Sequence, residues 1–142
     1  MSGPVLVTGA AGRIGTVLRG GLPERGWALR SLDVVPMPDV RPGEEQVVAD
    51  AADLVAMFDA TQGASAVVHL AGVSGESTWP AIRSTNIEST YCALEAARLN
   101  GVPRIVLASS NHATGYTRVR TAGCCARPTP RRGRTRTTAS PR

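Results

Sequence analysis

The stretch Gly9-Ala10-Ala11-Gly12-Arg13-Ile14-Gly15 decides the fold of this chain. The apolar run Pro4-Val5-Leu6-Val7-Thr8 precedes it and predicts a buried strand, and Ile14-Gly15-Thr16-Val17-Leu18-Arg19 predicts the start of a helix. The first glycine of the stretch permits a tight turn, the second lets the backbone approach a pyrophosphate, and the third lets the helix pack close to the strand. The helix N-terminus offers N–H groups and a positive dipole end to phosphates. Strand, loop and helix in this order favour a dinucleotide-binding unit over a plain glycine-rich turn.

The charges divide the chain into two unlike parts. Residues 1–116 contain eight arginines and 11 acidic residues, a net charge of −3, whereas residues 117–142 contain eight arginines, no acidic residue and a net charge of +8. The 142 residues allow one domain, which we expect over residues 1–116. Residues 117–142 lack apolar periodicity, so we expect a disordered, arginine-rich tail there.

The composition also bears on compartment and partners. No apolar run approaches the length of a membrane span and no signal peptide precedes the first strand, so we expect a cytoplasmic protein with no membrane partner. The three cysteines lack C-x-x-C spacing, which indicates neither a zinc site nor a disulfide framework. The basic tail lacks lysine and interleaved aromatic residues, which disfavours a nucleic-acid partner.

Strand and helix patterns alternate after the glycine-rich stretch. Further strands are expected over residues 28–33, 45–49, 65–70 and 104–108, and helices over residues 53–58 and 81–99. In the last helix, Tyr91, Leu94 and Ala97 predict one apolar face. The alternation predicts an α/β protein with a Rossmann-type doubly wound parallel sheet of about five strands in the order 3-2-1-4-5. We expect this sheet to be incomplete, and its open edge to favour aggregation rather than a native oligomer.

Asp33 closes the second strand, where a carboxylate accepts hydrogen bonds from the adenosine ribose hydroxyls. A carboxylate there repels a 2′-phosphate, and no arginine follows in Val34-Val35-Pro36, which favours NAD over NADP. The alternative is an aspartate that ends the strand by turn chemistry. Asp50 ends the third strand and is equally suited to reach the adenine edge or to cap the next helix.

The two histidines of the chain are candidate functional groups. His69 ends the fourth strand, and we interpret it as a buried histidine with a backbone partner rather than as a catalyst. His112 belongs to the polar run Ser110-Asn111-His112, which follows the fifth strand at the edge where open α/β sheets bind ligands. This run suits the hydroxyls of a sugar acid, and a Ser/Asn-rich turn is the alternative. The two histidines lack neighbouring ligands at metal-binding spacing, so no metal is expected.

Several motifs together resemble the extended short-chain dehydrogenase/reductase family, also called the NAD-dependent epimerase/dehydratase family. They are TGAAGRIG, Asp50-Ala51-Ala52-Asp53, His69-Leu70-Ala71-Gly72, Asn86 and Ser109-Ser110-Asn111-His112. Within the family, VSGES and SSNHATGY are most similar to bacterial uronate dehydrogenases, over residues 4–116. The resemblance implies an NAD-dependent enzyme whose intact relative oxidises a small-molecule hexuronic acid to an aldaric acid lactone. A nucleotide-sugar epimerase or dehydratase fragment and a noncatalytic NAD-binding regulator are the alternatives.

The resemblance also implies roles for individual residues. Ser110 matches the family's catalytic serine, which hydrogen-bonds the substrate oxygen undergoing redox chemistry, and Asn86 matches a structural residue of the central helix. The substrate-binding positions are Ser74, Ser110, Asn111 and His112. The expected cofactor-binding residues are Gly9, Ala11, Gly12, Arg13, Ile14, Gly15, Asp33, Asp50, Leu70, Ala71 and Gly72.

The family's Tyr-x-x-x-Lys pair is missing from the printed sequence. The tyrosine is the general acid or base, and the lysine lowers its pKa by its charge. The chain has no lysine, and Tyr91 and Tyr116 are not in the expected place. Shifted by one base, with permissible synonymous codons, the segment from Gly133 to Arg142, together with the last base of the preceding codon, can encode R-P-D-T-Y-Y-G-V-S-K, which contains the pair. We therefore interpret residues 117–142 as an out-of-frame translation and expect the printed chain to be inactive.

Overall fold

The structure is a computed structural model that describes residues 3–110. Contacts between residues divide the chain into one unit that ends at Ser109 and a second that begins at Ser110. The sheet and its helices belong to the first unit. No helix of the described part is both long and apolar enough to cross a membrane.

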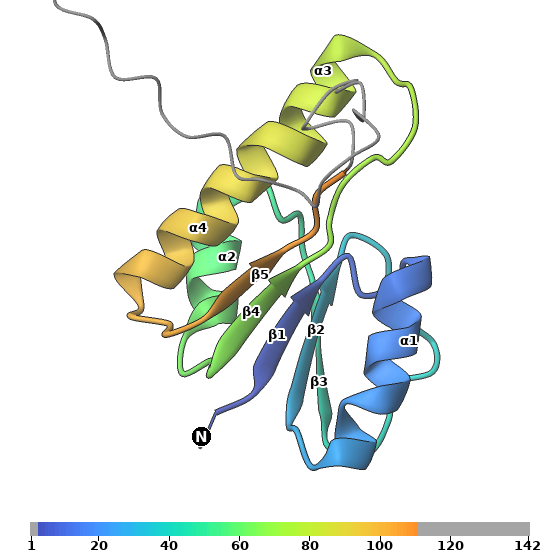
Figure 1. The fold of residues 1–142 in the computed structure, drawn as a ribbon, viewed down its shortest axis with the longest axis vertical. Coiled ribbons are helices and arrows are strands. Elements are labelled where there is room, and N and C mark those ends of the chain that lie inside the picture. Colours follow the sequence, from blue (N-terminus) through green and yellow to red (C-terminus); the bar gives the residue numbers. More distant parts are fainter. Residues whose placement is uncertain (1–2, 111–142) are drawn as a thin grey trace, which may run out of the picture. The chain divides into compact units, whose positions relative to one another are not determined.

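A five-stranded parallel sheet forms the centre of the first unit (Figure 1). Its strands are β1 (Val5–Thr8), β2 (Leu29–Asp33), β3 (Glu44–Val48), β4 (Ala66–His69) and β5 (Ile105–Leu107). They lie in the order β3-β2-β1-β4-β5, and every neighbouring pair is parallel. The expected strand order is therefore confirmed, and β1 is the central strand.

Helices cover both faces of the sheet, because three of the four crossovers between its parallel strands contain a helix, whereas residues 34–43 connect β2 to β3 without one. The helical segments are α1 (Arg13–Gly21), the 3₁₀ turn η1 (Pro23–Arg25), α2 (Leu54–Thr61), α3 (Trp79–Ile82), the π-helical segment η2 (Arg83–Glu88) and α4 (Ser89–Leu99). Figure 1 shows α1 on one face and the neighbouring α2 and α4 on the other. The alternating side chains of β1 serve both faces: Leu6 packs in the α2–α4 core, and Val5 and Val7 pack in the α1 core.

The expected apolar face of the last helix is wrong in its composition. Tyr91 and Leu94 are 61% and 42% exposed, whereas Ala97 is buried. The buried face of α4 consists mostly of small residues: Ser89, Cys92, Ala93, Ala96 and Ala97. Small side chains let the helix approach the sheet and α2 closely, so the larger residues lie on the opposite face. Asn100 ends the helix, and Gly101 follows with a φ of +62°.

Candidate functional site

A cavity of about 240 Å³ lies at the carboxyl edge of the sheet. It is bordered by the segments that follow the first four strands, at the point where the strand order reverses on either side of β1. Open α/β sheets bind ligands at such a point. The lining residues are Gly9, Gly12, Leu32, Asp33, Val34, Ala49, Asp50, Ala51, Leu70, Ala71, Gly72, Thr85 and Ser89.

The glycine-rich loop is packed so closely that two of its glycines leave no room for a side chain. Gly9 has a φ of +66°, and a Cβ on it would lie 2.8 Å from the Ala71 nitrogen. A Cβ on Gly15 would lie 2.5 Å from the Gly9 carbonyl oxygen. The tight turn expected at Gly9 is therefore confirmed. Gly15 serves close packing as well, although its nearest contacts are with the loop rather than with the strand.

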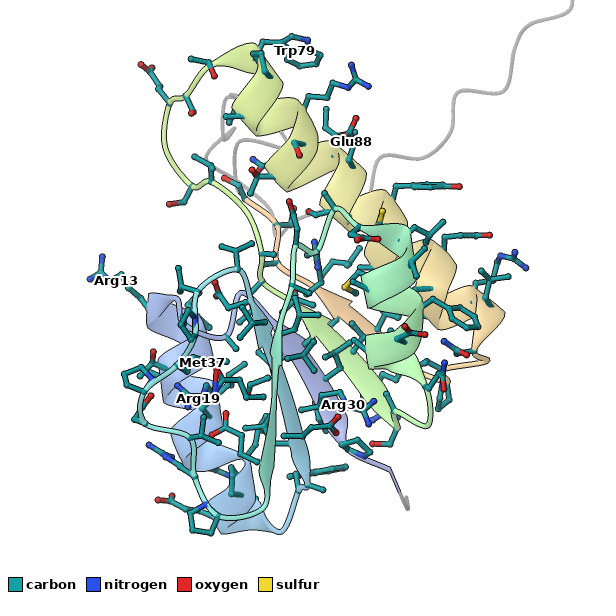
Figure 2. The ribbon with its side chains drawn as sticks, turned by 180° about the vertical axis from the view of Figure 1, so that it is seen from behind. Arg13, Arg19, Arg30, Met37, Trp79 and Glu88 are labelled. Carbon is teal, nitrogen blue, oxygen red and sulfur yellow. The ribbon has the colours of Figure 1, made fainter. Side chains whose placement is uncertain are left out.

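The N-terminal end of α1 borders the cavity without a capping side chain. Gly12 is the N-cap residue and lines the cavity, and no side chain caps this helix end. A Cβ on Gly12 would lie 3.1 Å from the Gly9 oxygen, so a side chain at this position would take up space next to the glycine-rich loop. Arg13 and Ile14 are exposed in the first turn, and Figure 2 shows Arg13 extending outward from it. This helix end can hold an anion against backbone N–H groups.

Asp33 links the glycine-rich loop to the end of β2. Its Oδ2 accepts a hydrogen bond from the Ala11 N–H at 2.9 Å, and its Oδ1 accepts one from the Val35 N–H at 3.2 Å. The bond to Val35 is the turn chemistry that the sequence allowed. The carboxylate also lines the cavity, where it can accept hydrogen bonds from a ligand.

Asp50 also lines the cavity, but it does not cap the next helix. Its Oδ1 accepts from the Ala52 N–H at 2.9 Å and so closes a turn. The N-cap of α2 is Asp53, which accepts from the N–H groups of Val55 and Ala56 at 2.9 and 3.2 Å. The interpretation of Asp50 as the N-cap is therefore wrong, because the cap lies three residues further along the chain. The place of Asp50 in the cavity wall fits the interpretation that it reaches the adenine edge of a cofactor.

The segment after β4 forms the opposite wall and is held by Asn86. The Asn86 Oδ1 accepts from the Val73 N–H at 2.7 Å, and its Nδ2 donates to the Val73 carbonyl at 3.0 Å. A Cβ on Gly72 would lie 3.3 Å from the Asn86 Oδ1. The amide thus bonds the backbone as a neighbouring strand would. Ser74, an expected substrate-binding residue, follows in the exposed loop.

His69 is buried, with 3% of its surface exposed. Its Nδ1 lies 2.8 Å from the Thr8 Oγ1, and its Nε2 lies 3.3 Å from the Ser89 Oγ. The partners of the ring are therefore hydroxyl groups, and the expectation of a backbone partner is wrong. Burial lowers the pKa of His69, which favours the neutral ring.

Thr85 and Ser89 line the cavity from η2 and α4, and the sequence did not predict them as site residues. Hydroxyl residues on a helix carry no local signal for a binding role, and their position follows from the packing of that helix on the sheet.

Among the expected site residues, Ser110 is the last that the structure describes and begins the second unit. Asn111 and His112 lie outside the described residues. Within residues 3–110, no three His, Cys, Asp or Glu side chains gather as metal ligands do.

Comparison with known proteins adds a family to this geometry. The sequence profile of the NAD dependent epimerase/dehydratase family matches residues 5–133. A uronate dehydrogenase of Pseudomonas putida is 43% identical over 115 residues, which are 80% of this chain and 43% of that relative. The chain thus spans less than half the length of this relative.

Solved structures share the fold. A uronate dehydrogenase of Agrobacterium tumefaciens, a tyrosine-to-alanine mutant complexed with NAD, is 42% identical with a TM-score of 0.72 and covers 78% of this chain and 42% of its own. A UDP-galactose 4-epimerase is 31% identical with a TM-score of 0.66 and covers 76% of this chain and 38% of its own.

Proposed function

The chain belongs to the NAD-dependent epimerase/dehydratase family, and from that premise we propose that it binds NAD in the cavity at the carboxyl edge of its sheet. One observation carries the proposal. The glycine-rich loop and the carboxylate of Asp33 line the same cavity and are joined by the bond from the Ala11 N–H to Asp33. A phosphate-binding loop and a ribose-binding carboxylate belong together in a dinucleotide site.

Each part of the cavity wall suits one part of the cofactor. The loop from Gly9 to Gly12 and the first turn of α1, with Arg13, Ile14 and the packing residue Gly15, would hold the pyrophosphate. Asp33 would accept from the adenosine ribose hydroxyls, and Asp50 with its alanine neighbours would border the adenine. The segment Leu70–Ala71–Gly72 would lie along the rest of the cofactor. The volume of about 240 Å³ is below the roughly 300 Å³ at which ligand pockets typically begin, so we assign the described residues part of the site rather than all of it.

The chemistry proposed for the intact protein is oxidation of a hexuronic acid. NAD, when bound, accepts the hydride that leaves the oxidised carbon. Ser110 would hydrogen-bond the oxygen on that carbon, and Ser74, Asn111 and His112 would bind the remaining polar groups of the sugar acid. The 43% identity with a uronate dehydrogenase, against 31% with a UDP-galactose 4-epimerase, favours the dehydrogenase over the epimerase.

The 142-residue chain itself is proposed to bind the cofactor but not to convert substrate. It contains no lysine and hence no Tyr-x-x-x-Lys pair, and loss of a positioned acid or base costs about 10²- to 10⁴-fold in rate. We ascribe the loss to a change of frame after Tyr116. A gene with the frame restored there would encode the pair and continue as an open reading frame, which sequencing of the DNA tests directly.

Calorimetric titration of the 142-residue chain with NAD tests the binding proposal. We expect saturable binding of one NAD, and Gly12→Ala should weaken it about tenfold because the added Cβ takes up space next to the glycine-rich loop, a loss of about 1.4 kcal/mol. Gly75→Ala is the matched control, since a Cβ there meets nothing within 4 Å. A chain that unfolds cooperatively yet binds no NAD contradicts the proposal.

Turnover is measured separately. The printed chain should not oxidise galacturonate or glucuronate with NAD, and the frame-restored protein should. Oxidation by the printed chain at an ordinary enzymatic rate would contradict the assignment of the missing pair.

A further inference from the structure

The buried imidazole of His69 is connected to both walls of the cavity without lining it. Thr8, which bonds one ring nitrogen, directly precedes Gly9 of the glycine-rich loop. Ser89, which bonds the other, lines the cavity from α4. The other hydrogen bonds of these hydroxyl groups determine the direction of their bonds to the ring.

Two backbone N–H groups already donate hydrogen bonds to the Thr8 hydroxyl oxygen. Its Oγ1 accepts from the N–H groups of Leu70 at 3.2 Å and Ala71 at 3.3 Å. The Leu70 N–H is shared with the Thr8 carbonyl oxygen, also at 3.2 Å. A hydroxyl has two acceptor sites and one proton to donate. The Thr8 proton is therefore directed to the Nδ1 of His69, which must be the unprotonated nitrogen of the ring.

The other end of the ring leads to the same assignment. The Ser89 hydroxyl donates to the Thr85 carbonyl at 2.5 Å, and the Thr90 hydroxyl donates to the Asn86 carbonyl at 2.7 Å. Both hydroxyl oxygens face the Nε2 of His69, at 3.3 and 3.5 Å, and each hydroxyl proton is already donated to a backbone carbonyl. They can serve Nε2 only as acceptors. The Nε2 of His69 thus carries the proton.

We propose that His69 is a positioning residue for the cofactor site: in its neutral Nε2–H tautomer it holds the Thr8 hydroxyl as the acceptor that fixes Leu70 and Ala71. A proton on Nδ1 would set a donor against the Thr8 O–H. Thr8 would then have to turn and give up its bonds to the two amides. Burial lowers the pKa of His69, in agreement with a ring that stays neutral.

The bonds matter for the cavity because of the close packing at Gly9. A Cβ on Gly9 would lie 2.8 Å from the Ala71 nitrogen, so the loop and the opposite wall are in direct backbone contact. Leu70 and Ala71 line the cavity themselves. When the Thr8 hydroxyl releases these amides, the wall and the glycine-rich loop lose a shared anchor. The expected effect is on cofactor affinity rather than on a chemical step.

The tautomer is tested first, by the ring ¹⁵N shifts of the labelled 142-residue chain at neutral pH. His69→Asn assigns the signals, because the chain has two histidines. We expect a protonated Nε2 and an unprotonated Nδ1 for His69, and amide exchange protection at Leu70 and Ala71. A protonated Nδ1 overturns the inference. This readout needs no cofactor, so it stands even if the NAD proposal fails.

The affinity test, which rests on the proposed NAD function, uses two matched pairs. His69→Asn keeps an acceptor for Thr8, whereas His69→Leu removes it; Thr8→Ser keeps the hydroxyl, whereas Thr8→Val removes it. We expect Asn and Ser to bind NAD within about threefold of the parent chain, and Leu and Val to bind about tenfold more weakly, the equivalent of one hydrogen bond. Equal affinity within each pair, with the fold verified by circular dichroism, overturns the inference. A parent chain that binds no NAD refutes the proposed function instead.

Discussion

The guanidinium of Arg19 in α1 is bonded to both carboxylate oxygens of Glu44 in β3. Its Nε donates to Oε1 at 2.5 Å and its Nη2 donates to Oε2 at 3.1 Å. The two side chains are 2% and 1% exposed. Ser31 and the Arg41 N–H also donate to Glu44. The pair therefore joins the α1 face of the sheet to its β3 edge, and Figure 2 shows Arg19 beside the strands.

Removing the charge of Glu44 should destabilise the fold strongly. Glu44→Gln removes the buried carboxylate partner of Arg19 and leaves the guanidinium with only the more exposed Asp39, whose Oδ1 accepts from Nη1 at 3.0 Å. Breaking a buried pair typically costs about 3–5 kcal/mol. Urea unfolding measures the loss. The control is Glu95→Gln in the more exposed Glu95–Arg98 pair, where we expect a much smaller change in the free energy of unfolding, because solvent screens that pair. Equal effects of the two substitutions would show that burial of the first pair has no energetic consequence.

Acid should weaken the fold over a defined range of pH. Burial of Glu44 opposes its ionisation, but hydrogen bonds from Arg19, Ser31 and the Arg41 N–H outweigh burial and lower the pKa of the carboxyl from 4.5 to about 2. Because the pKa is lower in the folded state, this stabilisation is present above pH 4.5 and is lost as the pH falls toward 2. Its size is on the order of 3 kcal/mol. Urea unfolding between pH 6 and pH 2 should show it, and Glu44→Gln should flatten that part of the profile.

Asp33 should discriminate between NAD and NADP. Asp33→Ala removes an acceptor for the ribose hydroxyls and the repulsion of a 2′-phosphate, so NAD affinity should fall about tenfold or more while NADP loses less. Titration calorimetry with each cofactor measures the ratio. Asp33→Asn is the matched variant, since it keeps an oxygen for the Ala11 N–H but loses the charge. An unchanged ratio of affinities in both variants would exclude Asp33 from the ribose site.

Asn86 should protect the backbone after β4. Asn86→Ala removes both bonds to Val73, and an unpaired buried group costs about 1–3 kcal/mol. We expect a loss of stability in that range and faster amide hydrogen exchange at Val73. Gln62→Ala is the control, because the Gln62 amide is exposed and bonds Asp59 at the surface. Val73 exchange that is unaffected by Asn86→Ala would refute this role.

Much of the fold was predictable because its signals are local. Strands β1, β4 and β5 are short, mainly apolar runs, whereas β2 and β3 also carry charged residues. The alternation of strands with helices requires parallel crossovers. All five strands and their order agree with that prediction to within one residue at their ends. The helix over residues 81–99 was predicted as an element but not in its burial, because the choice between Tyr91 and Ala93 as the buried residue depends on how closely α4 approaches the sheet.

The sequence by itself determined the glycine-rich loop, the strand order and the cluster of residues at the carboxyl edge, since these follow from conformational preferences and from periodicity over a few residues. The tertiary structure alone decided which side chains meet: Arg19 with Glu44, Asn86 with Val73, and Thr8 with His69, separated by 25, 13 and 61 positions. Such contacts depend on the distance and direction between packed elements, which no local pattern encodes. The anchoring of the cavity walls therefore becomes visible only once the sheet and its helices are assembled.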